Sequence, residues 1–162
     1  MEKRIHKLSI YTDGSCIGKN RSGGWCFVLT TNERKVPIIK SGSESNTTNN
    51  RMELIAVIKA LEKLDALKSV TKETNITIYT DSQYVTNMFN KGWISRWKSL
   101  NWLSVTKGNL IKNKDLVIKL DELVNNYRDI KFMCVKGHSN NELNNLCDKN
   151  AREQAIILDK VK

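Results

Sequence analysis

The sequence has few residues that could staple a small domain or bind a structural metal. Its four cysteines, Cys16, Cys26, Cys134 and Cys147, include no Cys-x-x-Cys pair, and it has only two histidines. A structural zinc site is therefore not expected. Because the chain shows no secretory signal, we expect reduced thiols, with Cys26 and Cys134 in the core.

Long apolar runs are also missing. The longest stretches are short, such as the run from Trp25 to Thr30, so we expect no membrane-spanning segment. The N-terminal residues are charged and lead directly into a strand pattern, so we expect no signal or transit peptide and a cytoplasmic protein. The length of 162 residues predicts a single domain, 1–162, that can bury a core without disulfides.

Positive charge is in excess. Lysine and arginine number 27 against 17 acidic residues, which gives a net charge of +10. This excess favours a nucleic-acid partner first and an anionic membrane surface second. A surface charged only for solubility is the remaining interpretation.

Apolar periodicity predicts an α/β fold. Tight turns join the first strands, which favours antiparallel pairing, and helices separate the later strands, which favours parallel pairing. The prediction is a mixed five-stranded sheet, three antiparallel strands plus two parallel additions, flanked by helices. The predicted strands are Leu8–Thr12, Trp25–Thr30, Val36–Lys40, Asn75–Thr80 and Ile130–Val135. The predicted helices are Arg51–Lys68, Gln83–Phe89, Trp93–Lys98, Lys114–Tyr127 and Glu142–Leu158.

A short repeat draws attention to two aspartates. The sequence Ile-Tyr-Thr-Asp occurs at residues 10–13 and again at 78–81, so Asp13 and Asp81 each follow an apolar strand. If the two strands are parallel neighbours, the carboxylates lie side by side at the end of the sheet where ligands bind. Each aspartate could instead serve only as a turn or helix-capping residue.

Two further acids lie on helices that face the sheet. Glu53 is in the first turn of its helix, at the end of the apolar stripe, where an unsatisfied carboxylate is costly. Asp148 shares a helix face with Ala151 and Ala155, which would permit a close approach. The alternatives are a helix-dipole role for Glu53 and a solvated surface position for Asp148.

Acidic residues without histidine or cysteine ligands suit hard cations such as Mg²⁺ or Mn²⁺. Two such ions, roughly 4 Å apart, can activate a water molecule and stabilise the leaving oxygen of a phosphodiester. This chemistry is consistent with a basic protein that binds nucleic acid.

Four sequence blocks resemble the type 1 ribonuclease H family of bacteria and eukaryotes. They occur in the family's order, and the resemblance covers about residues 8 to 155. The blocks are Thr12-Asp13-Gly14-Ser15-Cys16, the segment from Thr47 to Leu54, Thr80-Asp81-Ser82-Gln83-Tyr84-Val85, and Val135-Lys136-Gly137-His138 through Cys147-Asp148.

The resemblance implies an endonuclease that hydrolyses the RNA strand of RNA–DNA hybrids and leaves 3′-hydroxyl and 5′-phosphate ends. It implies that Asp13 contacts two Mg²⁺ ions, with Mn²⁺ as a substitute. Glu53 and Asp81 would hold the first ion, and Asp148 the second. His138 matches a loop histidine that assists proton transfer or product release. On its own, a loop histidine is usually just solvated.

The resemblance also implies a surface for the hybrid. Asn49, Asn50 and Gln83 match residues that contact the strands in the minor groove. Cys16 matches a backbone-contacting position, and Thr48 matches a phosphate-pocket position. Amide side chains can read the shallow minor groove of an A-like duplex without strong sequence preference. Turn chemistry is the simpler explanation for an asparagine-rich loop.

The segment at about 91–114 resembles the basic protrusion of the family, which implies that it holds the DNA strand. Residues 82 to 114 contain no acid. Trp93, Arg96 and Lys98 are its predicted binding residues, with the tryptophans mainly structural and the cations on phosphates. Lys107 belongs to the same basic set.

Two loops, 18–23 and 139–146, depart from the family pattern, and the first adds positive charge beside the substrate path.

We expect a monomer with no obligate protein partner. The alternatives are a nuclease of the same fold acting on DNA, a non-catalytic nucleic-acid-binding module, and a retroviral-type domain. The intact Asn49, Asn50 and Gln83 set argues against the first, and the complete carboxylate set argues against the second.

Overall fold

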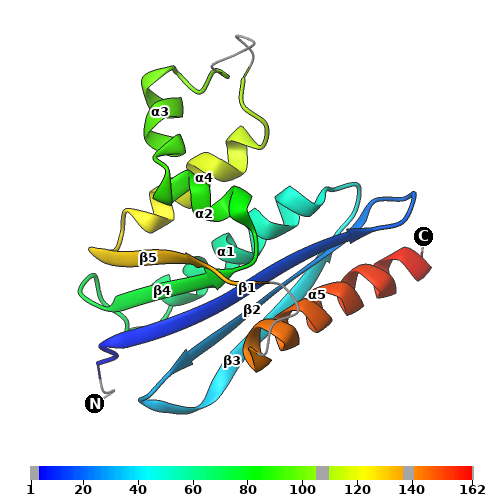
Figure 1. Ribbon diagram of the computed structural model, residues 1–162. Helices are drawn as coiled ribbons and strands as arrows, with labels where there is room; N and C mark the ends of the chain where they lie inside the picture. Colours follow the sequence, from blue (N-terminus) through cyan, green and yellow to red (C-terminus); the bar gives the residue numbers. More distant parts are fainter. Residues whose placement is uncertain (1–3, 105–109, 137–140, 162) are drawn as a thin grey trace.

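The computed structural model describes residues 4–104, 110–136 and 141–161 (Figure 1). Its strands are β1 (Lys7–Ile17), β2 (Ser22–Thr31), β3 (Arg34–Glu44), β4 (Asn75–Thr80) and β5 (Asp129–Cys134). Its helices are α1 (Asn49–Asp65), α2 (Gln83–Asn90), α3 (Trp93–Ser99), α4 (Lys114–Val124) and α5 (Glu142–Lys160). Within these ranges no helix is both long and apolar enough to cross a bilayer.

The strands form one five-stranded sheet in the order β3-β2-β1-β4-β5. The pairs β1–β2 and β2–β3 are antiparallel, whereas β1–β4 and β4–β5 are parallel. This confirms the predicted mixed sheet. Tight hairpins join β1, β2 and β3, which makes these strands antiparallel. Helix α1 precedes β4, and α2, α3 and α4 lie between β4 and β5, which allows these strands to run parallel to β1.

The two faces of the sheet carry different layers. Along β2, Phe27 and Leu29 point to a large core shared with α1, α2 and α4, while Cys26 and Val28 point to a smaller core under α5. This alternation follows from the two-residue period of a strand. Figure 1 accordingly shows α5 alone on one face, and α3 standing away from the sheet.

Small residues bring α5 unusually close to the sheet. Ala151 and Ala155 are fully buried. A Cβ atom added to Gly24 in β2 would lie 1.9 Å from the carbonyl oxygen of Ala151, which is far inside contact distance. The close approach expected from the alanine spacing is therefore confirmed, and it brings the first half of α5 beside β1 and β2.

The structure corrects several sequence-based expectations. Asp13 does not end its strand, because β1 continues to Ile17 in an unbroken ladder with β2, in which Asp13 pairs with Cys26. Cys134 is exposed rather than in the core, since it lies at the end of the edge strand β5. Helix α1 begins at Asn49, two residues earlier than predicted, because the Thr48 side chain caps it.

Candidate active site

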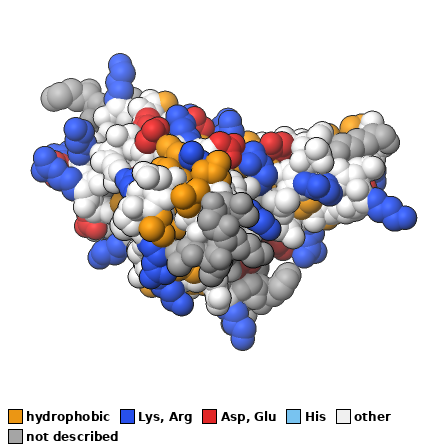
Figure 2. Space-filling model, turned by 90° about the horizontal axis from the view of Figure 1, so that it is seen from above, with side chains coloured by type: hydrophobic (Ala, Val, Ile, Leu, Met, Phe, Trp, Pro, Cys, Tyr) orange, Lys and Arg blue, Asp and Glu red, His pale blue; other side chains and the backbone are white. Residues whose placement is uncertain are grey.

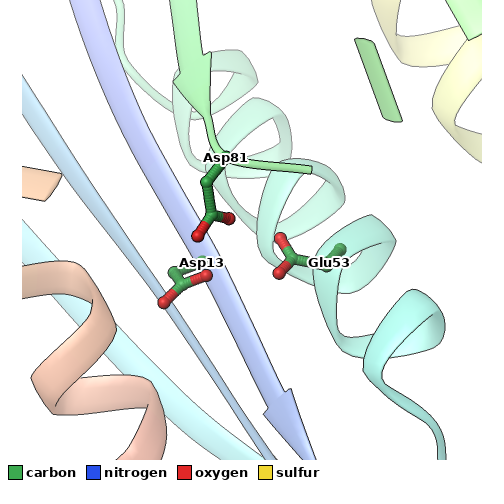
Figure 3. Close-up of side chains that lie close together, drawn as sticks. All are labelled: Asp13, Glu53 and Asp81. Carbon is green, nitrogen blue, oxygen red and sulfur yellow. The ribbon is translucent and has the colours of Figure 1, made fainter. Parts of the chain in front are cut away.

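Three carboxylates converge at one end of the central strands. Asp13 comes from the middle of β1, Asp81 directly follows β4, and Glu53 is in α1 (Figure 3). Each offers an oxygen, and these oxygens all lie within 4.8 Å of one another. The parallel register pairs Tyr11 with Tyr79, so the two copies of the Ile-Tyr-Thr-Asp repeat lie side by side.

Gly14 explains how α1 brings Glu53 to this point. A Cβ atom on Gly14 would lie 2.4 Å from the backbone nitrogen of Glu53 and 2.3 Å from the carbonyl carbon of Met52. Only glycine permits this approach of helix to strand. This role of Gly14 was not predicted from the sequence, although the glycine directly follows Asp13 in the Thr12–Cys16 block.

The electrostatics of the cluster are unfavourable without a cation. Asp13 and Glu53 are only 4% and 8% exposed. Burial, then the charge of Asp81 and a hydrogen bond with Asp148, raise the pKa of Asp13 from 3.8 to about 8. Burial and the charges of Asp13 and Asp81 also raise the pKa of Glu53 well above its usual value.

These features fit a hard divalent cation. The Oε2 atom of Glu53 is buried and has no hydrogen-bond partner among the residues that the structure describes. A buried carboxylate oxygen without a partner is costly. A divalent cation beside these oxygens would offset the repulsion and satisfy the orphaned atom. The donor set is entirely carboxylate, which suits Mg²⁺ or Mn²⁺ rather than zinc.

Asp148 approaches the cluster from the opposite face of the sheet. It lies outside the group of three, but it interacts with Asp13 strongly enough to raise the pKa of that residue. The preceding Cys147 anchors this part of α5, since its thiol donates to the carbonyl oxygens of Cys26 at 3.0 Å and Tyr11 at 3.4 Å. Asp148 is 33% exposed and lies 3.9 Å from Arg152.

The residues matched to hybrid binding lie at the start of α1 and α2. The Asn49 Oδ1 atom accepts a hydrogen bond from the backbone nitrogen of Cys16 at 2.7 Å, which joins the β1 end to α1. The Thr48 hydroxyl accepts from the backbone nitrogen of Arg51 as the helix cap. Asn50 and Gln83 are exposed on the first turns of α1 and α2.

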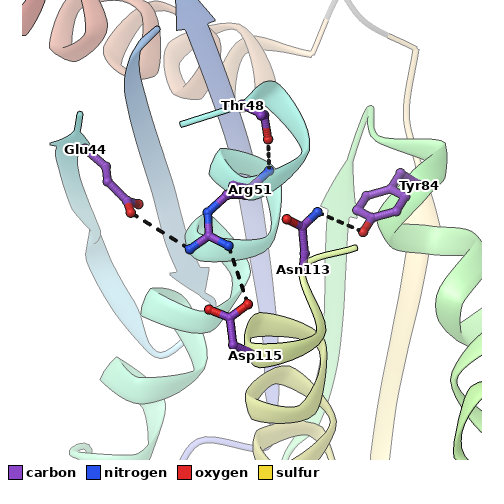
Figure 4. A network of polar contacts seen from close by, with 6 residues as sticks. All are labelled: Glu44, Thr48, Arg51, Tyr84, Asn113 and Asp115. Atoms are coloured by element: carbon purple, nitrogen blue, oxygen red, sulfur yellow. Dashed lines mark hydrogen bonds and ion pairs between the residues drawn. The ribbon is translucent and has the colours of Figure 1, made fainter. Parts of the chain in front are cut away.

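A polar network supports the start of α1 (Figure 4). Arg51 lies 4.0 Å from Glu44 at the end of β3 and 3.5 Å from Asp115 at the start of α4. Nearby, the Asn113 side chain donates to the hydroxyl of Tyr84 in α2. These contacts join elements far apart in the sequence, and no local sequence pattern predicts them.

The residues predicted in the protrusion divide into two groups. Trp93 and Trp97 are partly buried against the large core, with ring centroids 5.9 Å apart, as expected for tryptophans that are mainly structural. Arg96 is exposed, whereas Lys98 forms an ion pair with Asp121 of α4. Viewed from above, Lys and Arg side chains spread over this side of the molecule (Figure 2).

Two predicted residues lie outside the part of the chain that the structure describes. They are the candidate catalytic residue His138 and the basic residue Lys107. The role of each residue stays a prediction from the sequence.

Comparison with known proteins identifies the family. The RNase H family model matches residues 6–156. The chain is 44% identical over 154 residues to a ribonuclease H of Thermoanaerobacter sp. (strain X514), covering 95% of this chain and 93% of that protein. It is 46% identical over 153 residues to a ribonuclease H of Clostridium botulinum (strain Hall), covering 92% and 95%.

A solved structure agrees with both relatives. LC9-RNase H1, a type 1 RNase H with the type 2 active-site motif, superposes with a TM-score of 0.77 at 25% identity, covering 96% of this chain and 74% of that one. The fold, the carboxylate cluster and these matches agree, and the chain belongs to the RNase H family, among its type 1 members.

Proposed function

We propose that this protein is a ribonuclease H that hydrolyses the RNA strand of RNA–DNA hybrids, leaving 3′-hydroxyl and 5′-phosphate ends. The observation that carries the proposal is the convergence of Asp13, Glu53 and Asp81 within 4.8 Å. It is a cluster of acids in a protein whose net charge is +10. A basic protein with an acidic centre is suited to bind a polyanion and to hold the cations that phosphodiester cleavage requires.

The proposed cofactors are two Mg²⁺ ions, with Mn²⁺ as a substitute. Asp13 would contact both ions, Glu53 and Asp81 would hold one, and Asp148 would hold the other. Bound divalent ions would lower the pKa of a water molecule, which makes it a better nucleophile, and would neutralise charge on the phosphate. The protein contributes rigid placement, because Asp13 is fixed within a strand ladder and Glu53 by the contact of α1 with Gly14.

The proposed substrate surface continues from this centre. Asn49, Asn50 and Gln83 would contact the strands in the minor groove, Cys16 the backbone, and Thr48 a phosphate. Hydrogen bonding between Cys16 and Asn49 supports the proposal, because it presents these residues together. Trp93, Arg96 and Lys98 belong to the proposed DNA-strand side, and His138 is proposed to assist proton transfer or product release.

The remaining proposals concern the protein as a whole. We propose one catalytic domain over residues 1–162 with a basic protrusion at about 91–114. We also propose a monomer that works in the cytoplasm with no membrane contact and no obligate protein partner. The shared core beneath α1, α2 and α4 supports a single domain.

In the protrusion, Arg96→Ala is expected to weaken hybrid binding more than Lys98→Ala. Arg96 is exposed, whereas Lys98 forms an ion pair with Asp121. The charge of Lys98 is therefore partly neutralised and attracts a phosphate less strongly. Loss of one phosphate contact should weaken binding about three- to tenfold and make its salt dependence shallower by about one. Titration of labelled hybrid at several salt concentrations checks this. Equal losses for the two variants would contradict the assignment.

The function is tested with a panel of strand-labelled duplexes. Hybrid, double-stranded RNA and double-stranded DNA are incubated with protein while Mg²⁺ or Mn²⁺ is titrated. We expect metal-dependent cleavage of the RNA strand of the hybrid and little cleavage of the other duplexes. Equally fast cleavage of all-DNA duplex would support a DNA nuclease, and no metal-dependent turnover would support a binding module.

A further inference from the structure

The turn between β1 and β2 carries cationic residues that the proposed function leaves unused. No acidic residue occurs between Asp13 and Glu33, and the turn itself contains Lys19 and Arg21. Both side chains are exposed. This part of the surface therefore has local positive charge next to the end of β1 that carries Cys16.

The backbone of Arg21 is held in an unfavourable conformation. Its φ angle is 51°, in the left-handed region that suits glycine or asparagine better than arginine. Two contacts with Thr47 hold it there. The carbonyl oxygen of Arg21 accepts from the backbone nitrogen of Thr47 at 3.0 Å, and its Nε donates to the carbonyl oxygen of Thr47 at 3.0 Å.

This double contact ties the turn to the proposed hybrid surface. The same Thr47 carbonyl accepts from the thiol of Cys16 at 3.5 Å, and the backbone of Cys16 donates to Asn49. Arg21, Cys16 and Asn49 thus belong to one hydrogen-bonded unit. The next residue after Thr47 is Thr48, the proposed phosphate contact.

The outer part of the Arg21 guanidinium is available. Its Nε is used, and within the described ranges no carboxylate forms an ion pair with its terminal nitrogens. Asp159 of α5 lies against the same turn, but its carboxylate accepts a hydrogen bond from the Ser22 hydroxyl at 3.0 Å. A guanidinium fixed through Nε presents a pair of donors suited to a phosphate group.

We propose that Arg21 binds a backbone phosphate of the hybrid, adjacent to the phosphate assigned to Thr48. The inference rests on the proposed function, since it assumes that Cys16, Thr48 and Asn49 face the hybrid. The strained backbone has a purpose in this account, because it aims the guanidinium along the hybrid surface.

Arg21→Gly separates the side chain from the backbone. Glycine suits the positive φ angle, which offsets the loss of the Nε hydrogen bond to Thr47, so the melting temperature should change little, while hybrid affinity should fall about three- to tenfold. The salt dependence of binding should become shallower by about one, as expected for one lost phosphate contact. Binding is measured in an Asp13→Asn background, where the hybrid stays uncut, and kcat in the wild-type background should change less than about twofold.

Arg34→Ala is the matched control. Arg34 is also an exposed hairpin arginine whose Nε donates to a backbone carbonyl, that of Val36, but it lies at the opposite end of β2. We expect Arg34→Ala to keep the parent affinity and salt dependence, and Arg21→Lys to keep most of the salt dependence.

Two results would overturn the proposal. The first is an Arg21→Gly variant with the affinity and salt dependence of Arg34→Ala. The second is a fall in melting temperature together with a loss of affinity that Arg21→Lys does not restore, which would mean that the turn had been disrupted. If the wild-type protein does not cleave hybrid at all, the proposed function fails too. If the wild-type protein cleaves hybrid normally and substitution of Arg21 has no effect on binding, only this inference fails.

Discussion

Asp13→Asn is expected to abolish most hybrid cleavage and to leave hybrid binding intact. Asp13 lies at the centre of the cluster, and its pKa is shifted by burial and by interactions with Asp81, Asp148 and Glu53. Asparagine keeps its size but loses the charge that holds a divalent cation. Since such a cation contributes several kcal/mol to the transition state, we expect a rate loss of roughly 10³-fold or more. Single-turnover cleavage of labelled hybrid in Mg²⁺ measures it.

Asp129→Asn is the control for this substitution. Asp129 begins β5 and accepts a hydrogen bond from Asn75 at the other end of the sheet. We expect it to cleave within about twofold of wild type, because it is remote from the substrate surface. If the Asp13→Asn variant cleaves at the wild-type rate, Asp13 is not an active-site residue. Loss of hybrid binding in that variant would instead indicate a disrupted fold.

The second large effect concerns stability without divalent cations. The pKa of Asp13 is raised from 3.8 to about 8, mainly by burial. Between these two values the folded protein retains a proton that the unfolded chain releases. The stabilisation is therefore fully present below about pH 3.8 and is lost as the pH rises through about 8. Glu53 shifts in the same direction, also mainly through burial.

Asp13→Asn isolates this effect from other titrations. In EDTA, the variant should gain stability relative to wild type as the pH rises from 4 to 9, by on the order of a few kcal/mol. Urea unfolding at several pH values measures the difference. A difference that stays constant over this range would contradict the raised pKa of Asp13.

Saturating Mg²⁺ should reverse the loss in wild type only. At about 100 times its dissociation constant, a ligand of the folded state adds about 2.7 kcal/mol, which corresponds to roughly 5–10 °C in melting temperature at this chain length. The increase should be larger at pH 8 than at pH 5, and small in Asp13→Asn. The same increase in both proteins would place the stabilising cation elsewhere.

Much of the site could be predicted from local pattern. The Ile-Tyr-Thr-Asp repeat indicated that Asp13 and Asp81 lie side by side if their strands are parallel neighbours, and β1 and β4 are parallel neighbours. The apolar stripe of α1 indicated that Glu53 faces the sheet, and it is buried there. Such predictions work because the periods of helix and strand are local properties.

Other features depend on partners distant in sequence. Asp-Gly-Ser after Thr12 has turn chemistry, yet β2 extends the ladder past it. The pairing of Lys98 with Asp121 and the tight contact of Gly14 with α1 exist only in the folded chain. No local pattern encodes them, because each needs the packed arrangement of two elements.

The central claim is that Asp13, Glu53 and Asp81 form a divalent-cation site. Its most direct test is anomalous scattering from crystals of the wild-type protein grown with Mn²⁺. The account predicts a strong anomalous peak within ligand distance of carboxylate oxygens of these three residues, and its disappearance in Asp13→Asn. A peak elsewhere with none at this cluster, at a Mn²⁺ concentration that supports hybrid cleavage, would contradict it.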